Sequence, residues 1–314
     1  MQPPAPPADR AGEMTQARCI EAGDTHFITR RCTQRMFLLR PRPIVEQAFL
    51  YVSALAAEKL NIKIHAIIVL SNHWHALLTD PDANLPAFYK YVHMYVSKIL
   101  NCDMGRFEGL WSTEKTSVVT LQDEEDVLDK LTYLMANPVA GQLVKEGKQW
   151  PGLRRMWQAD ATSVTVERPK KFYRAEGKMP AEVTLTFARP PAMHELSDND
   201  ASKELELLVW EREEGERKRI KAKGGRYMGI AAILKQKLTA TPKTYAKKFG
   251  ISPRVGAKNK WARVEALRRL KTWYREYREA YLAWREGKRD VVFPYGTYAL
   301  RRFACVDCAA APPS

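Results

Sequence analysis

His73 and His75 are the residues whose type and spacing most clearly suggest metal chemistry. In a β-strand, side chains at positions i and i+2 project from the same face, so both imidazoles would point one way and Trp74 the other. Two neutral imidazoles form a platform for Mg²⁺, Mn²⁺ or a related divalent ion. The spacing alone is a weak indication, because many His-x-His pairs are ordinary surface or core residues.

Tyr133 and Asn137 form a second pair, four residues apart on a helix predicted for residues 123–136. Residues at this spacing share one helix face, so a phenol and an amide oxygen could both face a metal ion held by the sheet. The plainer interpretation makes Tyr133 a core aromatic residue and Asn137 the end of the helix before Pro138. Without the histidine pair, that interpretation would be preferred.

Two segments in this order resemble the REP-associated tyrosine transposases, which are domesticated relatives of the single-tyrosine insertion-sequence transposases in the HUH superfamily. The segments are NHWH at residues 72–75 and, about sixty residues later, YLMANPVAGQLV at residues 133–144. The resemblance covers roughly residues 25–155. It implies a ferredoxin-like HUH domain, single-stranded or hairpin DNA as the substrate, possible palindromic repeats among the targets, and a covalent 5′-phosphotyrosine intermediate.

Within this resemblance, His73 and His75 match the paired ligands of a Mg or Mn ion, and Tyr133 matches the nucleophile. Asn137 stands where related enzymes place a third, amide-bearing ligand. One departure follows Trp111. Many relatives have a Gln-x-Arg-Phe segment there, whereas this chain reads STEK at residues 112–115, which leaves the substrate contacts of this stretch open.

The implied reaction is nicking and strand transfer of DNA. A neutral tyrosine hydroxyl is a poor nucleophile, so a metal ion would have to orient the scissile phosphate and neutralise its charge. Attack would leave the 5′ phosphate on the enzyme and a free 3′ hydroxyl, and a second DNA 3′ end could reverse the step. No nucleotide cofactor is required.

Other interpretations remain open beside this one. The chain could be a domesticated, non-catalytic DNA-binding protein that keeps the HUH fold. A metallohydrolase is a poorer fit, because such sites usually add an Asp-His pair where this chain has Ala76 and Leu77. Tyr91 and Tyr95 have the spacing of two-tyrosine HUH replication initiators. Apolar residues on the same helix face indicate instead that these two tyrosines pack in the core. His65 reads as a core histidine, and His26 and His93 have no visible partner.

The elements that must position these residues follow the order β-α-β-β-α-β-α. Strands are predicted near residues 26–32, 62–70, 73–78 and 116–120, and helices at 43–60, 85–100 and 123–136. This order predicts an α+β fold: a ferredoxin-like antiparallel sheet with helices on one face, spanning a catalytic domain of residues 24–155.

The rest of the chain differs from this domain in composition and in expected structure. Residues 1–23 and 304–314 read as tails, and 156–196 as a connecting segment with short strands. Residues 197–303 are predicted to form a basic, mainly helical DNA-binding module. Of the net charge of +15, residues 217–289 carry +19, from 23 Lys or Arg against four Glu. Such a concentration, interleaved with aromatic residues, is typical of nucleic-acid contact; the aromatic residues are Trp261, Trp273, Tyr274, Tyr277, Tyr281 and Trp284.

Six basic residues are candidate phosphate contacts: Arg30, Arg31, Lys115, Arg268, Arg269 and Lys271. No apolar run approaches the length of a membrane span, and the N-terminus does not read as a secretion signal, so a cytoplasmic protein is expected. It is expected to be a monomer or a homodimer. The cysteine number is odd, and the Cys305/Cys308 pair lacks the second pair that a zinc site needs.

Overall fold

A mixed six-stranded sheet forms the centre of the computed structural model, which describes residues 17–174, 176–244 and 253–312. Its strand order is β5-β2-β3-β1-β4-β8. The four strands expected from the sequence are present, and two short edge strands complete the sheet. The bounds are β1 Thr25–Arg31, β2 Lys63–Leu70, β3 His73–Thr79, β4 Ser117–Leu121, β5 Arg154–Met156 and β8 Val255–Gly256.

The register of β1 against β3 determines what lies beside the two histidines. These strands are antiparallel, with Thr29 opposite His75 and Arg31 opposite His73. Directly opposed residues of an antiparallel pair point to the same face. Thr29 and Arg31 therefore share the face of the two histidines, and Trp74 occupies the other face.

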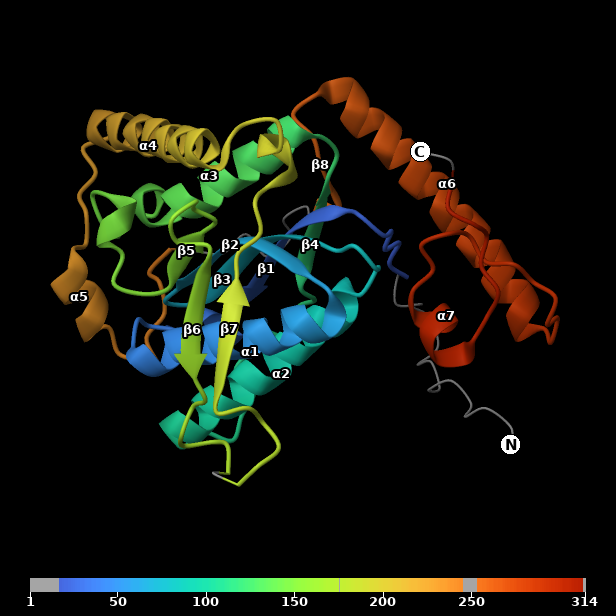
Figure 1. Ribbon diagram of the computed structural model, residues 1–314, viewed down its shortest axis with the longest axis horizontal. Coiled ribbons are helices and arrows are strands. Elements are labelled where there is room, and N and C mark those ends of the chain that lie inside the picture. Colours follow the sequence, from blue (N-terminus) through green and yellow to red (C-terminus); the bar gives the residue numbers. More distant parts are fainter. Residues whose placement is uncertain (1–16, 175, 245–252, 313–314) are drawn as a thin grey trace.

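Helices cover both faces of the sheet, which corrects the expectation of helices on one face (Figure 1). Helices α1 (Pro43–Leu60) and α2 (Leu85–Met104) cover the Trp74 face, where the Phe49 and Trp74 rings are 5.3 Å apart. Helix α3 (Glu124–Ala140) lies on the histidine face. In β2 every residue after Lys63 is buried, and a strand buried on both faces needs cover on both.

The sheet is also not wholly antiparallel. Strand β8, from the C-terminal half of the chain, pairs in parallel with β4, at Thr120↔Val255 and Leu121↔Gly256. Gly256 permits this close approach, because a Cβ there would lie 2.9 Å from the side chains of Leu121 and Val119. The open edge of β4 is thus covered by a segment that local patterns had not marked as a strand.

Helix α3 continues beyond its predicted end at Ala136. It includes Pro138 and ends at Ala140, and Pro138 and Val139 are buried. Proline removes one backbone donor from a helix. Here the last turn is held by Gly141 N donating to Asn137 O (2.8 Å) and by Leu143 N donating to Pro138 O (2.9 Å). The continued helix keeps Tyr133 and Asn137 one turn apart on the same rigid element.

The predicted domain boundary at residues 196/197 divides a single core. Helix α4 (Asp198–Ala222) packs on α3, and its Ala201, Leu205 and Val209 belong to the main hydrophobic cluster. The hairpin of β6 (Ser163–Glu167) and β7 (Glu182–Thr186) packs on α1. Ile20 is also buried, so residues 17–23 are not a free tail; residues 1–16 lie outside the described part.

A C-terminal lobe, residues 260–308, is mainly helical and has a small core of its own. It contains α6 (Lys260–Arg285) and α7 (Ala299–Ala304), and Ala280, Phe293 and Val306 are buried together. The buried Val306 shows that the segment after residue 303 is partly packed. Short α5 (Ile230–Lys235) and the 3-10 helices Thr33–Arg35, Gly147–Gln149 and Pro191–Met193 complete the described elements.

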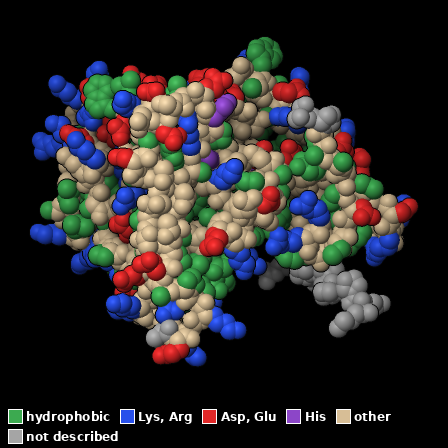
Figure 2. Space-filling view, viewed as in Figure 1, with side chains coloured by type: hydrophobic (Ala, Val, Ile, Leu, Met, Phe, Trp, Pro, Cys, Tyr) green, Lys and Arg blue, Asp and Glu red, His purple; other side chains and the backbone are tan. Residues whose placement is uncertain are grey.

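Aromatic side chains of α6 mostly pack rather than project into solvent. Trp273 stacks on Tyr277 at 5.1 Å, and Tyr277 on Tyr281 at 6.1 Å, while Tyr277 also contacts Phe293. In the face shown in Figure 2, Lys and Arg side chains lie over the end formed by α4 and α5 as well as over the C-terminal lobe. Within the described residues, no helix is both long and apolar enough to cross a membrane.

Candidate active site

Strand β3 presents His73 and His75 side by side on one face of the sheet. Their ring centroids are 4.8 Å apart with the planes nearly perpendicular, at 86°. Trp74, between them in sequence, is fully buried against α1 and α2. The alternation of a β-strand is the cause, because it sends neighbouring side chains to opposite faces.

Hydrogen bonds orient both imidazoles from their Nδ1 side. His73 Nδ1 lies 2.6 Å from Asn72 Oδ1, which can only accept, so this nitrogen donates. His75 Nδ1 lies 2.7 Å from Thr29 Oγ1. The Nε2 atom of His75 is buried and makes no hydrogen bond to any described residue. Nε2 of His26 and of His93 is likewise buried and unpartnered, but that of His75 lies beside a second imidazole, as a metal ligand would.

Both imidazoles are held in the neutral form. Burial, together with the charges of Arg31 and Arg35, lowers the pKa of His73 to about 4. Burial, then His73 and Arg31, lowers the pKa of His75 well below its usual value. A neutral imidazole is the form that coordinates a metal ion.

Tyr133 reaches this face from α3 and remains accessible. Its ring centroid is 6.3 Å from that of His75 and 5.9 Å from that of Phe27, whose own ring stacks on His75 at 5.1 Å. The residue is 37% exposed, so the plainer interpretation of Tyr133 as a buried core residue does not hold. Phe27 was not singled out from the sequence, since nothing local marks it as a neighbour of Tyr133.

Asn137 is half-buried one turn further along α3, and its side-chain amide makes no hydrogen bond to another described residue. Across residues 17–174, 176–244 and 253–312, no group of three or more His, Cys, Asp or Glu side chains could hold a metal ion. No third His, Cys, Asp or Glu of these residues therefore joins the two imidazoles in a metal-binding group.

Two cations that the sequence interpretation missed flank the Tyr133 ring. Lys130 Nζ is 5.9 Å and the Arg212 guanidinium carbon 6.0 Å from its centroid. Asp129 links them, at 2.9 Å to Lys130 and 3.1 Å to Arg212. Burial would raise the pKa of Asp129, but the hydrogen bonds and charges of these two cations bring it below its usual value. Helical spacing could have found Lys130, whereas Arg212 comes from α4.

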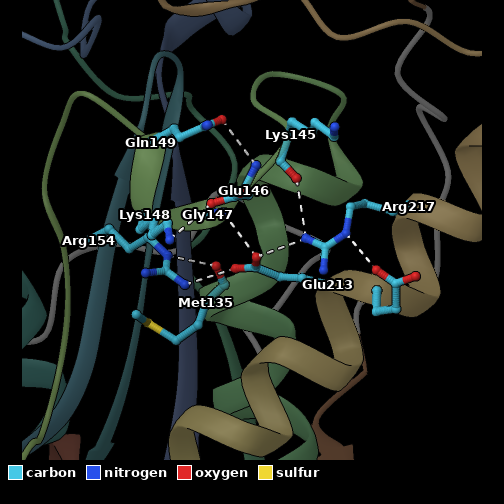
Figure 3. A network of polar contacts seen from close by, with 10 residues as sticks. Met135, Lys145, Glu146, Gly147, Lys148, Gln149, Arg154, Glu213 and Arg217 are labelled. Atoms are coloured by element: carbon cyan, nitrogen blue, oxygen red, sulfur yellow. Dashed lines mark hydrogen bonds and ion pairs between the residues drawn. The ribbon is translucent and has the colours of Figure 1, made fainter.

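A buried ion-pair network fixes α4 against α3 (Figure 3). Glu213, only 6% exposed, accepts from Gly147 N at 3.1 Å and from Arg154 Nη2 at 3.1 Å. Arg154 also donates to Met135 O on α3 at 2.9 Å. A Cβ on Gly147 would lie 2.7 Å from Arg154 Nη2, so a larger residue would have to displace this guanidinium. Because Glu213 is anchored, its neighbour Arg212 is directed towards Tyr133.

Of the six predicted phosphate contacts, Arg31 alone shares the face of Tyr133, where it is exposed opposite His73. Arg30 points to the other face and donates to the backbone carbonyls of Glu114 and, at 2.9 Å, Ser112. Lys115 is exposed on that other face as well.

The three predicted contacts on α6 lie away from this site. Arg268 and Arg269 line a separate cleft of about 630 Å³, in which carboxylates balance the charge of the arginines. Lys271 is exposed outside that cleft. The carboxylates in it are Glu21, Asp24, Glu265 and Glu276. Arg269 also donates to Gln122 Oε1 at 2.9 Å.

The other tyrosines and histidines considered from the sequence have packing or hydrogen-bond partners away from Tyr133. Tyr91 and Tyr95 pack against each other at 4.5 Å on α2, across the sheet from the two histidines of β3. His65 is a core histidine, as expected, with Nδ1 2.8 Å from Ala188 O and Nε2 2.8 Å from Thr79 Oγ1. His26 does have a partner, Thr120 Oγ1, at 3.1 Å.

Several solved structures match part of this chain. A REP-associated tyrosine transposase, solved bound to a REP hairpin, aligns with 45% of this chain and 81% of its own, at 20% identity and a TM-score of 0.38. A putative transposase from Deinococcus radiodurans aligns with 36% of this chain and 89% of its own, at 17% identity and a TM-score of 0.28. No family model and no curated protein matches the chain. At these TM-scores the likeness is distant and decides nothing about activity.

Proposed function

We propose that this chain is a metal-dependent, single-tyrosine DNA strand transferase of the transposase type. The observation that carries the proposal is the accessible Tyr133 ring 6.3 Å from His75, which is paired on the same face with His73. Tyr133 Oη would attack a DNA phosphorus atom. The new bond joins that oxygen to the 5′ phosphate, the bond to the 3′ oxygen breaks, and the phenolic proton leaves while the 3′ oxygen gains one.

His73, His75 and Asn137 would hold a divalent ion, Mg²⁺ or Mn²⁺. The unpartnered, buried Nε2 of a neutral His75 supports this fit. When bound, such an ion supplies Lewis-acid stabilisation of charge on the scissile phosphate. Thr29 and Asn72 keep the two imidazoles oriented through their Nδ1 atoms.

Lys130 and Arg212 would bind non-bridging oxygens of the phosphate next to Tyr133. Lys130 Nζ is 5.9 Å and the Arg212 guanidinium carbon 6.0 Å from the centre of the phenol ring, and Asp129 holds both side chains in place. Preorganised cations of this kind stabilise a phosphoryl transition state, because the charge that develops there meets groups already oriented. Exposed Arg31 would extend the contact along the DNA backbone beyond His73.

The proposed substrate is single-stranded or hairpin DNA. Support comes from the motifs at residues 72–75 and 133–144 and from the excess of positive charge. The REP-associated tyrosine transposase that aligns with 45% of this chain is described as bound to a REP hairpin.

Formation of a covalent adduct tests the proposal directly. Purified protein with Mn²⁺ and 5′-labelled or 3′-labelled hairpin DNA should yield a denaturation-resistant adduct that retains the 3′-side fragment. Tyr133→Phe should abolish it and leave metal binding intact, while Tyr95→Phe, in a packed tyrosine, should leave it unchanged. No adduct with any hairpin-bearing DNA would favour the non-catalytic DNA-binding alternative. Cleavage unchanged in Tyr133→Phe would favour a hydrolase.

A further inference from the structure

An open groove of about 1600 Å³ runs between α2 and the C-terminal lobe. Its lining residues come from the segment before β1, from Arg30 of β1, from α2 with the loop at residues 113–116, and from α6 and residues 298–303. Arg18 joins these walls, donating to Tyr89 on α2 at 2.8 Å and to Thr116 O at 3.1 Å. In Figure 1 the lobe that forms the far wall stands beside the end of α2.

The charge in this groove is almost entirely positive. Seven lining residues are Lys or Arg, and Glu114 is the single acidic one. Arg18 and Arg30 are tied to backbone or tyrosine oxygens, but the other five are exposed, and none of them forms an ion pair with a described carboxylate. Those five are Lys90, Lys115, Arg278, Arg285 and Arg302. This differs from the smaller cleft beside Arg268, whose carboxylates balance its cations.

Aromatic rings lie among these cations. Phe303 lines the groove and is 71% exposed. The Arg302 guanidinium carbon is 5.9 Å from the Tyr298 ring, and that of Arg285 is 5.9 Å from the Tyr281 ring. Alternating rings and cations suit a single-stranded polynucleotide, whose unpaired bases stack on rings while its phosphates meet the charges. The bases of a duplex are already stacked and cannot do so.

We propose that this groove binds a single-stranded polynucleotide, separately from the Tyr133 site. Arg30 and His93, which line it, lie on the opposite face of the sheet from His75. A strand held there is therefore not the one positioned against Tyr133, and the groove acts as a second anchoring site. Binding in the groove requires no chemistry at Tyr133, so the proposal goes beyond the proposed reaction and can fail or hold independently of it.

Affinity for labelled oligonucleotides tests the groove, with the full-length Tyr133→Phe protein as the parent so that cleavage cannot interfere. The double variant Arg278→Glu/Arg285→Glu should weaken binding of a 20-nucleotide oligo-dT at least tenfold in fluorescence anisotropy. It should also make the slope of log affinity against log salt shallower by about 1.4, the value for two lost single-strand phosphate contacts.

The matched control is Arg263→Glu/Arg275→Glu, which makes the same charge change at exposed positions of the same helix outside the groove. It should change affinity less than about threefold. An equal loss in both double variants would overturn the proposal, because binding would then follow net charge alone.

Phe303→Ala separates stacking from electrostatics. It should weaken binding of the single strand about tenfold and leave binding of a 20-base-pair duplex unchanged. If the duplex bound as tightly as the single strand and Phe303→Ala affected neither, the groove would be a general polyanion surface and the proposal wrong. Oligo-dT and oligo-U compared at equal length show whether DNA or RNA is the tighter occupant. Unaltered thermal unfolding of each variant confirms that the fold is kept.

Discussion

At the scale of single residues, neighbouring positions in β3 have different roles: one is part of the core and two belong to the candidate site. Trp74 is core, while His73 and His75 on either side of it face Tyr133. The histidines differ from His65 in one respect: both nitrogens of His65 are hydrogen-bonded, whereas Nε2 of His75 is not. Nε2 of His26 and of His93 is also buried and unpartnered, so what marks His75 as a candidate ligand is its position beside His73 and Tyr133.

Metal affinity should depend on this nitrogen. His75→Ala should weaken Mn²⁺ binding at least tenfold in isothermal titration calorimetry, because one of two imidazole ligands is lost. His194→Ala is the control, since His194 is largely exposed and far from β3 in the chain. Equal Mn²⁺ affinity in His75→Ala and the unaltered protein would remove the metal site from the proposed function.

Arg212 should affect the rate of adduct formation more than stability. Arg212→Ala removes one of two cations beside Tyr133, and we expect a rate about 10 to 100 times lower in single-turnover cleavage, with partial recovery in Arg212→Lys. Arg219→Ala, which alters an exposed cation on the same helix, should leave the rate unchanged. A rate unaffected by Arg212→Ala would mean that this side chain only pairs with Asp129.

At the scale of elements, the site depends on how α4 is attached. The Glu213–Arg154 pair is buried, and Arg154 also reaches α3 through Met135 O. A buried pair of this kind adds little net stability over apolar packing, but breaking it leaves an uncompensated charge. The pair fixes the position of α4 along α3, and so determines which turn of α4 faces Tyr133.

Two glycines give a matched test of this attachment. Gly147→Ala should lower the free energy of unfolding by about 1–3 kcal/mol, since the new methyl group would press on Arg154 and Glu213. Gly215→Ala, within α4, meets nothing within 4 Å and should raise it by up to about 1 kcal/mol through helix propensity. Urea denaturation of both variants measures the difference, and destabilisation by both would contradict this account of the network.

At the scale of the whole molecule, acid stability should reflect histidines buried as neutral groups. Burial lowers the pKa of His26 to about 3 and that of His65 to about 4. Burial, with the charge of Arg30, lowers the pKa of His93 to about 3. Below pH 6.5 the unfolded chain takes up protons that the folded protein does not, so stability falls as pH decreases from about 6.5 towards 4.

His93→Phe should reduce this loss. A phenyl ring can pack between Trp74 and Trp111 as the imidazole does, and it takes up no proton in the unfolded state. Between pH 7 and pH 5 we expect the variant to lose about 1–2 kcal/mol less stability than the unaltered protein. Burial raises the pKa of Asp24 to about 7, which gives the opposite slope, but both proteins share that contribution. Parallel curves of urea midpoint against pH would rule the explanation out.

Local periodicity was sufficient to predict much of the candidate site. The period of two in a strand put His73 and His75 together, and the spacing of four on a helix put Tyr133 and Asn137 together. The strands and helices through α3 were predicted to within a few residues at most, and the end of α3 was missed because Pro138 lies in its last turn. The excess of C-terminal charge is a property of composition and needs no structure.

Only the tertiary structure decided which distant segments meet. It covers both sheet faces with helices, brings Arg212 of α4 to Tyr133, and sends Arg30 and Arg31 to opposite sides of the molecule. It also turns most aromatic rings of α6 inward, towards a core of its own. The physical reason is that a periodic pattern defines the faces of one element, whereas the partner of each face is selected by burial and charge pairing across the whole chain.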